Sequence, residues 1–168
     1  MAVRTVRRQP RVSTGYRRIL VPVVDNSGSE EAVDVACRLA AERHGSLTVT
    51  TVVEVPTQLP LDAHMDEEEE DARVVLARAQ AIAASYGVDI STCVVHARDA
   101  AEAIVEQARR TGAEILVVGG VRRGRGLTRS APFRGTIRDV LRKAPCRVLV
   151  IAAQAPPGSR GGSRLPAR

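Results

Sequence analysis

The sequence has almost no aromatic side chains. They make up 2% of its 168 residues, with two tyrosines, one phenylalanine and no tryptophan, whereas hydrophobic residues as a whole make up 44%. A core must therefore be built from Val, Ile, Leu and Ala. The chain is long enough for one domain of ordinary size and too short to favour two.

Long apolar runs are also absent. No run reaches the roughly 18 to 20 residues that a membrane-spanning helix requires. Residues 1–18 contain arginines but lack the hydrophobic stretch of a signal peptide. We therefore expect a cytoplasmic protein that does not insert into membranes.

Paired cysteines are lacking as well. Cys37, Cys93 and Cys146 are odd in number and far apart, with no Cys-x-x-Cys pair. This pattern argues against a disulfide framework and against a zinc site. It predicts free thiols that are buried as small hydrophobic groups.

Lysine occurs once, at Lys143, so the excess of positive charge comes from arginine. The formal net charge is +6, but residues 1–18 carry six arginines and residues 154–168 carry three, with no acid in either segment. The body between them is mildly acidic, which argues against nucleic-acid binding by the folded part. We predict a disordered basic tail over 1–16, one domain over 17–153 and a disordered tail over 154–168. A weaker hypothesis gives the arginine-rich tails a nucleic-acid or acidic partner.

Apolar runs alternate with segments of helical periodicity along the body. The predicted strands are 19–24, 47–53, 88–95, 114–118 and 146–151, and the predicted helices are 29–44, 72–86, 100–110 and 136–143. This alternation predicts an α/β fold, a five-stranded parallel sheet with helices on both faces. The acidic run 66–71 before the second helix is interpreted as a solvated helix start, with a metal or partner site as the alternative.

Three of the predicted helices begin with a capping signature, in which a short oxygen-bearing residue precedes an acid by three positions. The three capping residues are Ser27, Asp99 and Thr136. Each helix start follows a strand, so their free N–H groups should lie along one edge of the sheet, where parallel sheets bind ligands. The pattern predicts an anion-receptive pocket at that edge.

The segment 119–135 combines five glycines with five arginines. Glycine lets the backbone approach an anion and arginine neutralises it, so a phosphate-facing loop is one interpretation. A flexible, charged surface loop is the other.

Several enzyme motifs are missing. A P-loop needs Gly-Lys-Ser/Thr, and the dinucleotide fingerprint fails because Arg129 stands where its last glycine belongs. His44, His64 and His96 have no cysteine or carboxylate at ligand spacing, and His96 is the best candidate of the three because it lies at the productive sheet edge. The sequence demands no enzyme, and we expect at most very slow ATP hydrolysis.

Three stretches resemble the universal stress protein family. They are Arg18–Ser27, Gly112–Gly120 and Gly135–Ile151, and the resemblance extends from about Tyr16 to Ala153. It implies the adenine nucleotide alpha hydrolase-like fold, a three-layer sandwich.

Members that bind ATP have the pattern Gly, two residues, Gly, nine residues, then Gly-Ser or Gly-Thr. Gly135-Thr136 fits its end, but the residue separated from Gly135 by nine residues is Arg125, not a glycine, and Gly120 and Gly124 stand one residue too far apart. The acid that contacts adenine in the family is also displaced by one position, to Asp25.

The resemblance implies that ATP or another adenine nucleotide binds, with or without Mg, unless the altered spacing abolishes binding. Asp25 would face the base or ribose, Val53 and Ala97 would line the adenine slot, and glycines would surround the phosphates together with Thr136. The implied nucleotide-binding residues are Pro22, Val23, Val24, Asp25, Val53, Ala97, Gly119, Gly120, Arg122, Arg123, Gly124, Gly135 and Thr136. An Asx-turn remains the alternative for Asp25, and helix capping a further role for Thr136.

The leading hypothesis is therefore a nucleotide-responsive regulator in the stress response. The alternative is a nucleotide-free protein of the same family that acts as a dimeric interaction module. Family members usually pair through the last strand, so we expect a homodimer through Cys146 to Ala152, whose β-rich edge suits strand pairing.

Overall fold

A computed structural model describes residues 16–120 and 133–152 of the chain. In these residues five strands alternate with four helices. They are β1 Arg18–Pro22, α1 Ser27–Arg43, β2 Ser46–Glu54, α2 Asp66–Ser85, β3 Ile90–Ala97, α3 Ala100–Thr111, β4 Ile115–Gly119, α4 Phe133–Lys143 and β5 Arg147–Ile151. The two predicted tails, apart from Tyr16, lie outside the described residues, as do the predicted site residues Arg122, Arg123 and Gly124.

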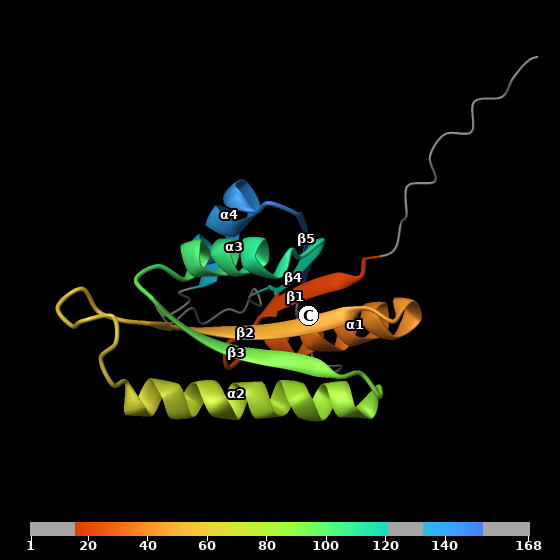
Figure 1. Cartoon of the computed structure of the whole chain (residues 1–168), viewed down its shortest axis with the longest axis horizontal. Helices are drawn as coiled ribbons and strands as arrows, with labels where there is room; N and C mark the ends of the chain where they lie inside the picture. Colours follow the sequence, from red (N-terminus) through yellow and green to blue (C-terminus); the bar gives the residue numbers. More distant parts are fainter. Residues whose placement is uncertain (1–15, 121–132, 153–168) are drawn as a thin grey trace, which may run out of the picture.

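The five strands form one parallel sheet in the order β3-β2-β1-β4-β5. Ile19 of β1 pairs with Leu47 on one side and with Ile115 on the other, so β1 is the central strand. The helices α1 and α2 cover one face of the sheet, and α3 and α4 cover the other (Figure 1). This arrangement confirms the predicted α/β fold with helices on both faces.

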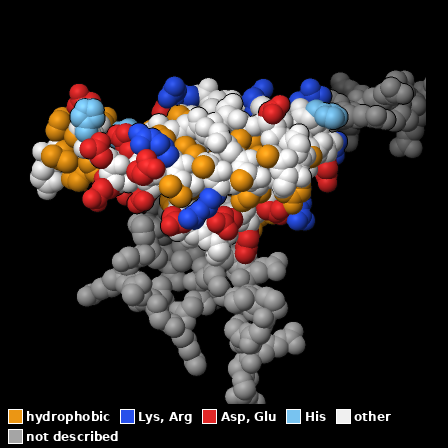
Figure 2. All heavy atoms as spheres, turned by 90° about the horizontal axis from the view of Figure 1, so that it is seen from below, with side chains coloured by type: hydrophobic (Ala, Val, Ile, Leu, Met, Phe, Trp, Pro, Cys, Tyr) orange, Lys and Arg blue, Asp and Glu red, His pale blue; other side chains and the backbone are white. Residues whose placement is uncertain are grey.

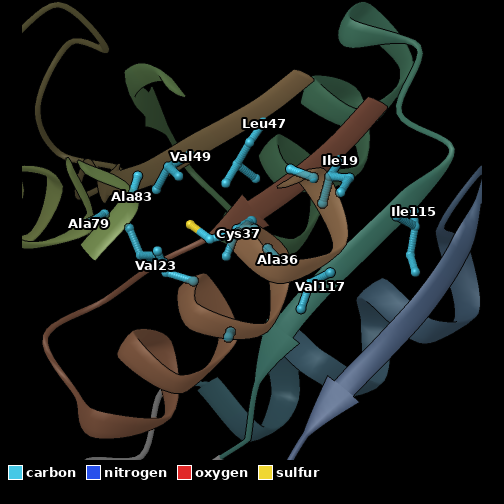
Figure 3. Close-up of a cluster of buried hydrophobic side chains, with 14 of the residues drawn as sticks. Ile19, Val23, Ala36, Cys37, Leu47, Val49, Ala79, Ala83, Ile115 and Val117 are labelled. Carbon is cyan, nitrogen blue, oxygen red and sulfur yellow. The ribbon is translucent and has the colours of Figure 1, made fainter. Parts of the chain in front are cut away.

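The side chains of β1 alternate between two aliphatic cores. Ile19 and Val21 pack with α1 and α2 in the larger core, which Figure 3 shows, whereas Leu20 packs with α3 and α4 on the opposite face. Burying one such side chain contributes roughly 1.5 to 3 kcal/mol. A chain almost without aromatic residues is thus held by two layers of Val, Ile, Leu and Ala.

Two of the three predicted helix caps are wrong. Asn26, not Ser27, is the N-cap of α1, where its Oδ1 accepts the Ser29 N–H at 2.7 Å. Thr136 is not a cap, because α4 begins at Phe133 and Thr136 lies inside its first turns. The predicted cap of α3 is confirmed, since Asp99 accepts the Glu102 N–H at 2.8 Å.

The acidic run 66–71 forms the first turns of α2. Figure 2 views the molecule from the side of α2 and shows acidic side chains gathered at the end where this helix begins. Glu69 and Glu70 pair with Arg73 at 3.4 and 2.9 Å, and Glu69 also contacts His96 at 3.2 Å. Within the described ranges no three His, Cys, Asp or Glu residues are grouped so that they could hold a metal ion. No helix in those ranges is long and apolar enough to cross a membrane.

Candidate functional site

A cavity of about 170 Å³ opens at the carboxyl ends of β1 and β2, on the face covered by α3 and α4. It is lined by Pro22, Val23, Val24, Val52, Glu54, Ala100, Ile104 and Thr136. A cavity of about 150 Å³ is known to hold a benzene molecule, so this one has room for a flat ring. Six of the eight lining residues are apolar, and the polar ones are Glu54 and Thr136.

The turn after β1 brings three predicted site residues to this cavity. Pro22 ends the strand, and the Val23 N–H then donates to the carbonyl of Thr50 at 2.8 Å, so the chain continues along β2 for one more residue. The Val24 N–H donates to the hydroxyl of Ser29 at 3.0 Å, which fixes the turn into α1. The backbone of this turn therefore holds Pro22, Val23 and Val24 against the cavity.

The alternation of β2 decides which of its valines reaches the cavity. Val53 is buried under α2, where it packs with Met65 and Ala72. Val52 points to the opposite face and lines the cavity. Because successive strand residues face opposite sides, Val52 lines this cavity and Val53, which the resemblance placed in an adenine slot, does not.

Asp25 lies beside the cavity turn, but its carboxylate is bound elsewhere. Its Oδ1 accepts from the Arg78 guanidinium of α2 at 2.5 Å, and Arg78 also lies 4.0 Å from Glu30. The helix α2 covers the sheet face opposite to the cavity. Asn26, rather than Asp25, supplies the side chain that caps the following helix.

The predicted phosphate glycines at the end of β4 lie against other backbone segments. A Cβ atom on Gly119 would overlap the backbone of Gly28, and one on Gly28 would overlap the carbonyl oxygen of Gly120. A Cβ atom on Gly120 would stand 2.8 Å from the carbonyl oxygen of Ile151. These three glycines therefore allow α1, β4 and β5 to meet closely, a role that the sequence reading did not include.

The remaining predicted residues are spread along the same sheet edge. Ala97 ends β3, where its carbonyl accepts the Val55 N–H at 2.8 Å. Gly135 is exposed on α4, with no atom within 4 Å of a Cβ built on it. Thr136, one residue further along the helix, lines the cavity.

Two of the helix starts that were expected to receive an anion already have protein acceptors. In α3, the Ala100 N–H donates to Glu54 Oε1 at 3.0 Å and the Glu102 N–H donates to Asp99. In α1, the Ser29 N–H donates to Asn26. The carboxylates at α3 complement the positive end of its dipole, so that helix start does not itself favour a phosphate.

Four of the lining residues were not predicted from the sequence: Val52, Glu54, Ala100 and Ile104. The strand alternation could have found Val52 if the register of β2 had been known. Glu54 carried a usable signal, because it is an acid at the carboxyl end of a buried strand, the edge where parallel sheets bind ligands. Together the eight residues form an apolar slot with a carboxylate and a hydroxyl, which suits a flat ring that carries a polar edge.

Comparison with known proteins gives consistent results. A model of the Universal stress protein family matches residues 15–152. A solved protein from the universal stress protein family of Burkholderia pseudomallei is 29% identical, with a TM-score of 0.65 over 83% of this chain and 98% of its own.

Two further solved structures contain nucleotides. A universal stress protein from Archaeoglobus fulgidus in complex with dAMP is 22% identical, with a TM-score of 0.64 over 82% of this chain and 98% of its own. A universal stress protein in complex with cAMP is 24% identical, with a TM-score of 0.63 over 83% of this chain and 98% of its own. At these identities the likeness shows a shared fold. No curated protein matches the sequence.

Proposed function

The chain belongs to the universal stress protein family and has its adenine nucleotide alpha hydrolase-like fold, and on this premise we propose that it is a nucleotide-responsive regulator that binds an ATP- or AMP-type ligand. It would act in the cytoplasm during stress, by binding rather than by turnover. ATP would bind with or without Mg.

The observation that carries this proposal is the apolar slot beside the central strand. Its walls, formed by Val24, Val52 and Ile104, suit a purine ring, and Thr136 places a hydroxyl on α4 next to it. The slot lies at the carboxyl edge near the point where the strand order reverses, which is where open parallel sheets bind nucleotides. Two solved structures of the same fold carry dAMP and cAMP.

The phosphates would then lie toward the first turns of α4 and the segment that precedes it. Gly135 and Thr136 belong to those turns. Gly119 ends β4 and Gly120 follows it, but both pack against backbone of other segments, so a phosphate would lie beyond them rather than at their Cα atoms. Arg122, Arg123 and Gly124 fall in the stretch outside the described residues and complete the predicted set.

Calorimetry with AMP, ATP and cAMP tests the proposal. The purified protein should bind at least one of them, and Val52→Phe should abolish binding because the larger side chain fills the slot. The matched control is Val74→Phe, which makes the same exchange at an exposed position of α2 and should leave binding unchanged. If the unchanged protein binds no adenine nucleotide at millimolar concentration, the proposal is rejected.

A nucleotide-free interaction module is the second candidate, and one observation favours it. Arg78 holds the acid that resembles the family's adenine contact, Asp25, away from the slot. A mass spectrum of the purified protein in native buffer discriminates the two functions. A copurified adenine nucleotide supports the first, whereas a ligand-free protein that also fails the calorimetric test supports the second.

In either function the protein would form a homodimer through residues Cys146 to Ala152. The strand β5 is at the edge of the sheet, and Val150 on it is 41% exposed. An unpaired, apolar edge strand favours pairing with another chain. Light scattering should report a dimer that Val150→Arg splits, whereas Val74→Arg, at an equally exposed valine of α2, should leave it intact. A monomer at micromolar concentration contradicts this assignment.

A further inference from the structure

Glu54 is the one acid among the described residues that line the slot, and only one of its two carboxylate oxygens accepts a hydrogen bond from them. Its Oε1 accepts the Ala100 N–H at 3.0 Å, which holds the carboxylate at the start of α3. Its Oε2 has no hydrogen-bond partner among the described residues. An ionised carboxylate offers about four acceptor sites on its two oxygens, so Glu54 can accept from a ligand without releasing the helix.

The surroundings of Glu54 favour a directed hydrogen bond. Glu54 is itself exposed, and Val24, Val52 and Ile104 line the same cavity. A ligand ring that fills the cavity would shield the hydrogen bond from water, and hydrogen bonds to a charged acceptor are stronger in apolar surroundings than in water. Thr50 pairs with Pro22 and lies two residues before Val52 on the same strand face. Its buried hydroxyl has no partner in the described part of the chain, but Thr50 is fully buried and does not line the slot.

The charge of Glu54 also fixes the direction in which a nucleotide can enter. A phosphate beside this carboxylate would be repelled by the like charge, so the phosphate end must lie away from it. In adenosine 5′-monophosphate the end farthest from the phosphate is the edge of the base that carries the exocyclic amino group. That group donates hydrogen bonds, and an ionised carboxylate can only accept them, so the two are complementary.

On the premise of the proposed function, we propose that Glu54 reads the base, with its free Oε2 accepting an N–H of the exocyclic amino group of adenine. The family pattern gives this task to an acid after the first strand, and here that acid is bound by Arg78. Glu54 reaches the same slot from the end of β2. It is a specificity-determining residue, and its preference is for purines that present a donor at this edge.

The test compares AMP with purine riboside 5′-monophosphate, which lacks only the amino group. The unchanged protein should bind AMP roughly ten- to a hundredfold more tightly, the range expected for a hydrogen bond to a charged acceptor. Glu54→Ala should bind both ligands equally. Glu54→Gln keeps an uncharged acceptor and should show an intermediate preference.

Asp99→Ala is the matched control. Asp99 is the second carboxylate at the start of α3, where it accepts the Glu102 N–H, but it does not line the slot. This variant weakens the same helix start and should keep the full preference for AMP. If Glu54→Ala keeps the preference, or if the unchanged protein binds both ligands equally, the role of Glu54 is overturned while the proposed function stands. If neither ligand binds although ATP or cAMP does, the role of Glu54 is overturned as well, and if none of these nucleotides binds, the proposed function itself fails.

Discussion

Gly119 at the end of β4 and Gly28 in the first turn of α1 pack backbone against backbone. A Cβ atom on Gly119 would overlap the carbonyl group of Gly28, and both residues are buried. The contact joins α1 to β4, a neighbour of β1 in the sheet. It therefore fixes where α1 begins next to the edge that holds the slot.

Gly119→Ala should destabilise the protein by about 2 kcal/mol or more. The added methyl group meets backbone atoms, which cannot rotate away as a flexible side chain could, so α1 and β4 must separate. Urea unfolding measures this loss as a lower midpoint.

Gly135→Ala is the control for that experiment. Gly135 lies in α4, and no atom stands within 4 Å of a Cβ built on it. Alanine favours a helix over glycine by up to about 1 kcal/mol, so this variant should be as stable as the parent or more stable. Equal losses in the two variants would contradict the close-packing role of Gly119.

Asp25 and Arg78 form an exposed ion pair, with 70% and 50% of their side chains exposed. Exposed pairs contribute about 0 to 1 kcal/mol, so Asp25→Asn should lower the free energy of unfolding only slightly. The substitution should also weaken AMP binding less than Glu54→Ala does, because the Asp25 carboxylate lies toward α2. Calorimetry measures the AMP affinity of the two variants. A larger loss in Asp25→Asn would mean that Asp25, not Glu54, meets the ligand.

The strands and helices could be predicted because their signals are local. The buried strand β4 is an uninterrupted apolar run, and Asp99 stands alone as a possible cap before α3. At α1 three adjacent residues, Asp25, Asn26 and Ser27, can all cap a helix. The choice depends on the backbone, which is extended at Asn26 with φ −157°.

The site was less predictable because long-range contacts decide it. Val52 and Val53 are both apolar, and only the pairing of β2 with its neighbours determines which one faces the slot. The direction of Asp25 depends on Arg78, 53 residues later in the chain. The role of Glu54 at α3 likewise depends on Ala100, 46 residues later.

The side chain of Arg98 binds the backbone of the loop between β2 and α2. Its guanidinium donates to the carbonyl of Val55 at 3.0 Å, to that of Leu59 at 2.5 Å and to that of Pro56. A lysine ammonium is a point charge without this planar fork. Arg98→Lys should therefore speed amide exchange in residues 55–65, as measured by mass spectrometry. Arg109→Lys, which alters a single exposed contact with Glu106, should not, and unchanged exchange in Arg98→Lys would contradict the loop-holding role.

Cys37 lies in the middle of the larger core, among Ala36, Val23 and Ala83 (Figure 3). Burial, reinforced by the charge of Asp34, raises the pKa of this thiol from 9.0 to about 11. The thiolate is the reactive form of cysteine, so Cys37 should resist alkylation in the folded protein and react once the chain is unfolded. Mass spectrometry after alkylation, with and without urea, measures both states. Modification of Cys37 without urea at pH 8 would contradict this burial.

The raised pKa of Cys37 also predicts how stability depends on pH. Between pH 9 and pH 11 the unfolded chain has lost the Cys37 proton while the folded chain still holds it, so increasing pH favours the unfolded state. The loss approaches about 1.4 kcal/mol per pH unit within that window and vanishes below it. Cys37→Ala lacks this group but keeps every other group that titrates there. Its free energy of unfolding should therefore fall less steeply than that of the parent above pH 9, and parallel curves would show that the Cys37 thiol ionises as readily in the folded protein as in the unfolded chain.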